Sequence, residues 1–149
     1  MAGSGRPGAI GVKVGHLINT FSTSPTLVAG DFNTQLFRRD GGEDTWHEDM
    51  VARGLERKLS QKGMLGSDGR YHLDLTPIER LSKELEFTSI CELANDSTPT
   101  SESGLVVIDG FLVSRSFLEH WEYVIGSYEV YPGGPGDHRV ATCAFARKA

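Results

Sequence analysis

The stretch TLVAGDFNTQL, residues 26–36, decides how the rest of the chain is interpreted, because an apolar run leads directly into polar groups. Residues 27–29 predict a buried strand, and Asp31 and Asn33 follow it two residues apart. Alternate residues of an extended segment point to the same side, so the carboxylate and the amide would lie together where the strand ends. Open α/β sheets bind ligands at the carboxyl ends of their strands. The stretch therefore predicts one part of a site.

Two later apolar segments carry polar residues in comparable places. LVVIDGFLV, residues 105–113, predicts a largely buried strand with a single carboxylate, Asp109, in its middle, and Asp137 and His138 begin the predicted strand DHRVATCAFA, residues 137–146. Taken singly, each residue has a simpler explanation, as a turn former, an acid bonded to the backbone or a capped loop end. Together, each at a place where the pattern expects an apolar residue or a strand end, they predict one constellation of acids, an amide and an imidazole.

The remaining segments predict an α/β or α+β chain around these strands. An apolar stripe at helical spacing in residues 14–21 predicts a helix before the first strand, and residues 46–63 and 76–87 predict two more. Residues 121–131 predict an interrupted strand, and residues 95–104 predict an exposed polar loop. No compositional break divides the chain.

Length and composition predict a single domain, residues 1–149, with flexible, glycine-rich residues 1–9. The net charge of −5 argues against broad, sequence-blind binding to nucleic acid, although a bound divalent metal can invert the charge of a nuclease site. The apolar runs are too short to span a membrane, and residues 1–19 lack the apolar core of a secretory signal, so we expect an intracellular protein. Cys91 and Cys143 are expected to be buried thiols.

The three motifs resemble, in this order, the late motifs of the endonuclease/exonuclease/phosphatase family of metal-dependent phosphoesterases. GDFN at residues 30–33 resembles the family's GDxN, IDGFLVS at 108–114 resembles its Asp-bearing strand, and GDHR at 136–139 resembles its S-D-H motif. The resemblance implies part of a four-layer α/β/β/α sandwich. This chain would supply one mainly antiparallel or mixed sheet with helices on one face.

The resemblance also implies a role for each polar residue. Asp31 would orient or deprotonate the attacking water, and Asn33 would hydrogen-bond a phosphate oxygen. His138 would bind the scissile phosphate, and Asp109 would fix the tautomer and orientation of that imidazole. Asp137 would lie near the metal, so Asp31 and Asp137 are the expected ligands of Mg²⁺ or Mn²⁺.

The chain departs from the family pattern at several places. Gly110 stands where the family has an aromatic residue, and Gly136 stands where it has Ser. The family's early motifs, which include a metal-binding Glu in a Q-E context, are absent from the 30 residues before Asp31. We therefore expect a partial domain that binds metal weakly by itself. Another copy, or a missing N-terminal half, would cover the apolar sheet face.

The expected function is metal-dependent phosphodiester hydrolysis of a nuclease-like kind, with nucleic acid as a possible substrate. A degenerate, non-catalytic relic that acts as an interaction module stays open, because the Glu motif is missing. A lipid or inositol phosphate phosphatase stays open too, since the same late motifs serve both chemistries. The acidic balance of the chain favours a small or non-polymeric substrate.

Overall fold

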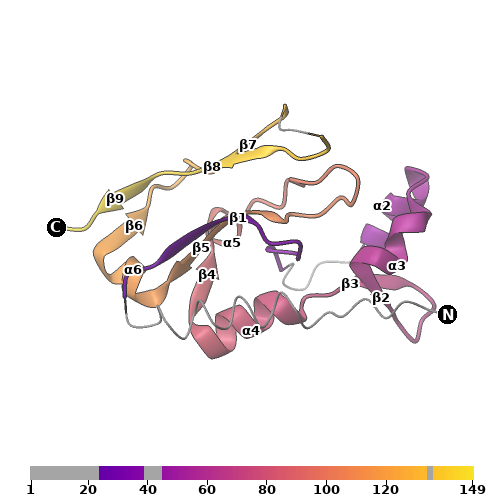
Figure 1. Cartoon of the computed structure of the whole chain (residues 1–149), viewed down its shortest axis with the longest axis horizontal. Helices are drawn as coiled ribbons and strands as arrows, with labels where there is room; N and C mark the ends of the chain where they lie inside the picture. Colours follow the sequence, from indigo (N-terminus) through magenta and orange to yellow (C-terminus); the bar gives the residue numbers. More distant parts are fainter. Residues whose placement is uncertain (1–23, 39–44, 134–135) are drawn as a thin grey trace.

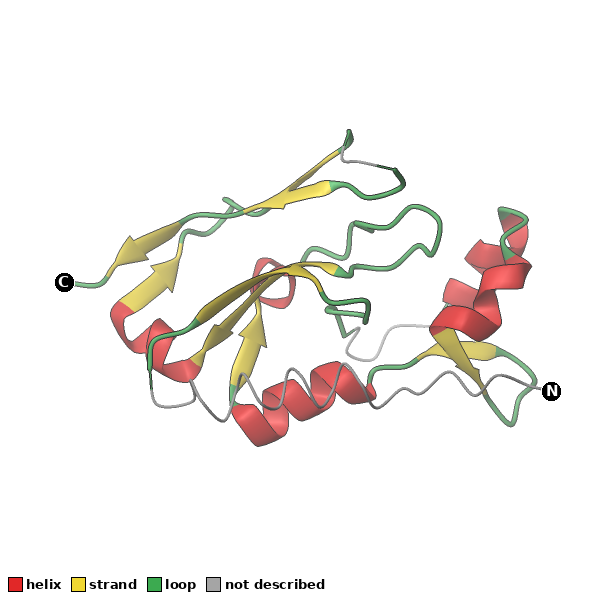
Figure 2. Ribbon diagram, in the orientation of Figure 1, coloured by secondary structure: helices red, strands yellow, loops and turns green. Residues whose placement is uncertain are grey.

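The computed structural model of the 149-residue chain describes residues 24–38, 45–133 and 136–149. The predictions for residues 1–9 and 14–21 lie outside this part. Short helices alternate with antiparallel strands, which confirms the α+β class (Figure 1, Figure 2). The elements are β1 (Leu27–Asp31), α2 (Trp46–Ala52), η1 (Glu56–Lys58), α3 (Leu59–Lys62), β2 (Gly63–Leu65), β3 (Tyr71–Leu73), α4 (Thr76–Leu85), β4 (Phe87–Ser89), α5 (Ile90–Ala94), β5 (Asp109–Ser114), α6 (Arg115–His120), β6 (Trp121–Tyr123), β7 (Glu129–Tyr131), β8 (Val140–Thr142) and β9 (Phe145–Arg147).

The central sheet is antiparallel and has the strand order β1-β5-β4. Three further two-stranded ladders join β2 to β3, β6 to β9 and β7 to β8. The described strands thus form four sheets, where the sequence predicts one. The β6–β9 and β7–β8 ladders run along one side of the central sheet, and α4 lies on the other side (Figure 1). The short ladders follow from short strands, since the predicted strand at residues 121–131 is interrupted at Gly126, whose φ is +80°.

The main core lies between these layers. Leu112 and Val113 of β5 and Phe87 of β4 are almost fully buried, and Ile78 and Leu81 of α4 pack into the same cluster. Partly buried side chains of β7, β8 and β9 close the cluster from the other side. Burial of a large aliphatic or aromatic side chain contributes about 1.5–3 kcal/mol, so β5 is anchored by its middle.

A second, smaller core holds the helices that follow the first strand. The segment just before β5 alternates between the two cores: Val106 and Ile108 face the second core and Val107 faces the first. In the second core, Trp46 and Met50 are buried, and the indole Nε1–H of Trp46 donates to the carbonyl of Gly104 at 2.9 Å. The segment that leads into Asp109 is therefore held on both sides.

The helix predicted for residues 46–63 is broken in the structure. α2 ends at Ala52, and Gly54 follows with a φ of +67°, a left-handed conformation that stops a helix. The chain then re-enters helical structure as η1 and α3, and Lys62 is the last helical residue. The four-residue apolar spacing spans the break, which explains why periodicity predicts one helix.

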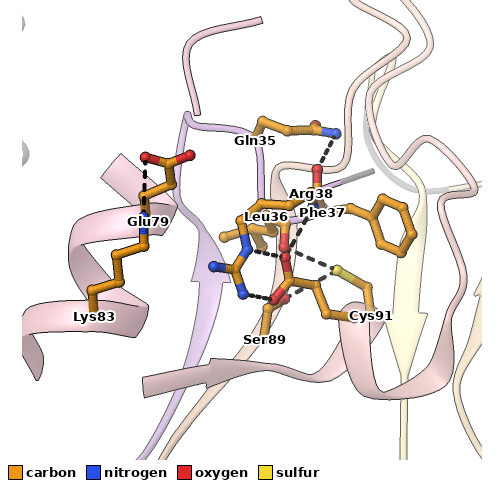
Figure 3. A network of polar contacts seen from close by, with 9 residues as sticks. Gln35, Leu36, Phe37, Arg38, Glu79, Lys83, Ser89 and Cys91 are labelled. Atoms are coloured by element: carbon orange, nitrogen blue, oxygen red, sulfur yellow. Dashed lines mark hydrogen bonds and ion pairs between the residues drawn. The ribbon is translucent and has the colours of Figure 1, made fainter. Parts of the chain in front are cut away.

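A network of polar contacts holds the chain that follows β1 (Figure 3). Arg38 forms a bidentate ion pair with Glu92 of α5, with Nε–Oε1 and Nη2–Oε2 distances of 2.6 and 2.8 Å, and its backbone N–H donates to the same carboxylate. The Cys91 thiol lies 3.4 Å from the carbonyl oxygen of Leu36 and 3.0 Å from Oγ of Ser89. Burial raises the pKa of Cys91 to about 11, so this thiol is a buried, unreactive core group, as expected. Cys143, for which burial is also expected, is only partly buried.

Among the described helices, none has both the length and the apolar character needed to cross a bilayer.

Candidate active site

Two carboxylates face each other where β1 and β5 meet. The antiparallel register places Asp31 directly opposite Asp109. Like charges in directly opposed positions destabilise a β ladder, so this pair costs stability unless a positive charge lies close by. The side chain of Asp109 is 19% exposed, and Asp31 is exposed. The pair therefore lies at an accessible end of the central sheet.

The imidazole of His138 is a neighbouring group that can carry a positive charge. Its Nδ1 lies 2.9 Å from Oδ2 and 3.1 Å from Oδ1 of Asp109, so an Nδ1–H group donates to this carboxylate. That hydrogen bond raises the pKa of His138 above its ordinary value, and the negative charges of Asp109, Asp31 and Asp137 raise it further. The structure thus produces the acid-braced imidazole that the motifs predict.

Asp31, Asp109 and His138 converge on one point. Each offers an oxygen or nitrogen atom that could ligate a metal, and these atoms all lie within 4.8 Å of one another. Two carboxylates beside an imidazole suit Mg²⁺ or Mn²⁺ through the carboxylate oxygens, which are the hard donors that these ions prefer. Asp137 lies outside this group, so among the described residues Asp31 is grouped with Asp109 instead of with Asp137.

Asn33 lies beside Asp31 for a different reason from the one that the sequence suggests. β1 ends at Asp31, and Phe32 turns inward, with its N–H donating to the carbonyl of Ile108 at 2.8 Å. Asn33 has a φ of +50°, and its N–H donates to Oδ1 of Asp31 at 2.8 Å. This is an Asx turn, a device that Asp and Asn support well. The exposed amide therefore follows from a turn and not from strand alternation.

Asp137 lies on the other side of the imidazole. Its Oδ1 is 3.8 Å from Nε2 of His138, and a hydrogen bond from the Ser103 side chain lowers the pKa of Asp137. Gly136, which stands where the resembled motif has Ser, has a φ of +69°. This conformation suits glycine and strains serine, so the departure from the motif has a backbone cause.

The loop at residues 95–104 is predicted to be exposed, and this prediction is wrong at Thr100 and Ser101. Thr100 and Ser101 are 0% and 2% exposed. Thr100 Oγ1 accepts hydrogen bonds from the backbone N–H groups of Ile108 and Asp109, each at 2.9 Å. Local composition gives no signal for this burial, because it depends on bonds to residues eight and nine positions later.

Arg139, the last residue of the GDHR motif, is already paired. Arg139 Nη2 lies 2.7 Å from Oε1 of Glu102, and Nε lies 2.9 Å from the same oxygen. A phosphate group that approaches His138 would therefore have to compete with Glu102 for this guanidinium. The His138 imidazole has a donor atom within 4.8 Å of both opposed carboxylates.

Comparison of the chain with protein-family models, with curated proteins and with solved structures gave no match in any of the three. The functional assignment therefore depends on the geometry of the site.

Proposed function

We propose that the chain is a metal-dependent phosphoesterase domain that hydrolyses phosphodiesters in a nuclease-like reaction. The convergence of Asp31, Asp109 and His138 within 4.8 Å is the observation that carries the proposal. Phosphodiester hydrolysis needs a group that orients water and a positive group that stabilises the charge growing on phosphate. An exposed carboxylate beside an acid-braced imidazole meets both needs.

Each side chain has a role that its environment supports. Asp31 is exposed and can orient a water molecule or accept its proton. His138 is held through Nδ1 by Asp109, which leaves Nε2, 3.8 Å from Oδ1 of Asp137, as the ring nitrogen that would donate to a phosphate oxygen when the ring is charged. The raised pKa of His138 keeps this ring charged to a higher pH, which strengthens that hydrogen bond. The exposed amide of Asn33 would add a donor to a second phosphate oxygen.

Asp31 and Asp109 are the residues that would hold Mg²⁺ or Mn²⁺. When bound, the ion would neutralise phosphate charge and lower the pKa of a coordinated water. We assign Asp109 in place of Asp137 as the partner of Asp31, because Asp137 lies outside the converging group. Two carboxylates would make a weak site, which suits a chain that lacks the Glu motif of the resembled family.

We further propose that the layers correspond to part of an α/β/β/α sandwich. α4, the central sheet and the two ladders β6–β9 and β7–β8 give three successive layers, which supports this arrangement (Figure 1). The remaining layer would come from a second copy or from another segment. Light scattering of the purified chain tests for the second copy.

Hydrolysis of a labelled duplex oligonucleotide and of bis(p-nitrophenyl) phosphate, with Mg²⁺ or Mn²⁺, tests the proposal. We expect His138→Gln and Asp31→Asn to lower the rate by about 10²–10⁴-fold, the usual contribution of a positioned acid or base. Asp68→Asn is the matched control, because Asp68 also pairs with a partly buried histidine, at 3.1 Å from Nε2 of His72. Equal rates for the wild-type protein and all three variants would refute the proposal.

Two other functions are outcomes of the same design. Calorimetric titration with Mn²⁺ should give heat for the wild-type protein and less heat for Asp31→Asn. If the wild-type protein gives neither heat nor hydrolysis, Asp31 and Asp109 bind no metal ion. That result would favour a non-catalytic interaction module. Hydrolysis of a soluble inositol phosphate without cleavage of the oligonucleotide would favour a phosphatase, which the net charge of −5 suits better.

A further inference from the structure

The Thr100 side chain holds the backbone of Asp109, the carboxylate partner of His138. Thr100 is fully buried, at 0% exposed, and its Oγ1 accepts the backbone N–H groups of both Ile108 and Asp109 at 2.9 Å. Asp109 is the first residue of β5, not the middle of a strand as the sequence predicts, and its N–H group is held by the Thr100 hydroxyl. The hydroxyl therefore fixes the backbone from which the Asp109 carboxylate projects.

The backbone of residues 100 and 101 holds the segment that carries His138. The N–H of Arg139 donates to the carbonyl of Thr100 at 2.7 Å, and Ser101 forms an isolated antiparallel bridge with His138. Asp109 and His138 are 29 residues apart in sequence, and both are tied to positions 100 and 101. One short segment thus sets the relative position of the two groups.

We propose that Thr100 is a positioning residue that fixes the orientation and tautomer of His138 through Asp109. Removal of Oγ1 would leave two buried N–H groups without an acceptor, and the loop or the start of β5 would shift to satisfy them. A shift of Asp109 loosens the Nδ1–H hydrogen bond. The hydrogen bond that one ring nitrogen makes decides which nitrogen carries the proton, so the tautomer reports this shift.

The NMR shifts of the His138 ring nitrogens, at a pH where the ring is neutral, test the proposal without a substrate. We expect the proton on Nδ1 in the wild-type protein and in Thr100→Ser, which keeps the hydroxyl. In Thr100→Val, which has nearly the same shape without the acceptor, we expect the Nε2–H form to gain population. If Thr100→Val does not fold, Thr100→Cys replaces it, because a thiol is a weak acceptor in a similar volume.

Ser114→Ala is the matched control, because Ser114 carries the same device at the other end of β5. Ser114 is only 2% exposed. Its Oγ accepts hydrogen bonds from the backbone N–H groups of Thr26 and Phe117, at 3.0 and 3.1 Å. This variant should be destabilised while the His138 tautomer stays as in the wild-type protein. A tautomer unchanged in Thr100→Val, or equally changed in Ser114→Ala, would overturn the proposal.

A kinetic measurement extends the test and rests on the proposed function. Misplacement of a catalytic group by about 1 Å can cost about 10²-fold in rate, so kcat should fall by about 10–10²-fold in Thr100→Val, and KM should stay within about twofold. Thr100→Ser should restore kcat. A wild-type protein without hydrolytic activity would count against the proposed function, and the tautomer would still decide the role of Thr100.

Discussion

The two ends of β5 use the same hydrogen-bonding device and lead to different results. At Ser114, a buried hydroxyl accepts two backbone N–H groups and caps α6, so the chain passes directly from strand to helix. At Asp109, the buried hydroxyl of Thr100 accepts two backbone N–H groups, and a carboxylate is left facing Asp31 and His138. One end stabilises a junction, and the other positions reactive groups.

The two ends of β5 differ in whether their polar groups are neutral or charged. The Ser114 end brings together neutral groups that bond one another. The Asp109 end opposes two carboxylates across the ladder and needs the imidazole beside them. Local arrangements that cost stability are typical of functional sites, because the surrounding structure must hold them in place. The comparison therefore separates the scaffold from the proposed site within one strand.

Truncation of a core side chain of β5, between the two ends of the strand, should have the largest effect on stability. Leu112 is 1% exposed in the main core, so Leu112→Ala should lower the free energy of unfolding by about 2–5 kcal/mol. Urea denaturation followed by circular dichroism measures the change. Leu93→Ala on α5 is the control, since Leu93 is 45% exposed and should cost less than about 0.5 kcal/mol. Equal losses for both variants would contradict the assignment of the core.

Ser114→Ala should have an intermediate effect. It removes the N-cap of α6 and leaves the N–H groups of Thr26 and Phe117 without their acceptor. The expected loss is about 1–2 kcal/mol in the free energy of unfolding, measured in the same way. Hydrolysis per folded molecule should not change. An activity loss as large as that of His138→Gln would show that the two ends are coupled and would break the comparison.

Asp31→Asn should have a smaller effect of the opposite sign. It removes one of two directly opposed carboxylates, and the asparagine can still accept the N–H of Asn33, so we expect a gain of about 0.2–1 kcal/mol. Denaturation at a pH where His138 is neutral measures this gain, because the attraction between Asp31 and the imidazolium is then absent. A loss of stability there would mean that Asp31 serves the fold and not a site.

The pH dependence of stability should show the smallest effect. The pKa of His138 is raised in the folded protein, so its stabilising contribution is complete below the ordinary value of 6.5 and is lost as pH rises through the raised pKa. The difference in unfolding free energy between the wild-type protein and His138→Gln should therefore be largest in mild acid and shrink at higher pH. A difference that grows with pH would have the wrong sign for a hydrogen bond to ionised Asp109.

The sequence predicts the polar residues at the strand ends of the site better than it predicts the residues that hold those strand ends in place. β1 and β5 are recognisable because apolar runs meet Asp31 and Asp109, and an apolar run also follows His138. Thr100 is hidden in a polar loop, since its burial arises from hydrogen bonds to later residues. The ion pair between Arg38 and Glu92 joins residues 54 positions apart, which no local pattern reveals. Such long-range contacts become visible only when the chain is folded.

A crystal structure of the chain, grown with Mn²⁺, tests most directly whether β1, β5 and the segment before β8 bring their polar groups to one place. We expect donor atoms of Asp31, Asp109 and His138 to lie within 4.8 Å of one another, with Nδ1 of His138 hydrogen-bonded to the Asp109 carboxylate. A structure in which Asp31 and His138 occupy different faces of the central sheet would contradict it.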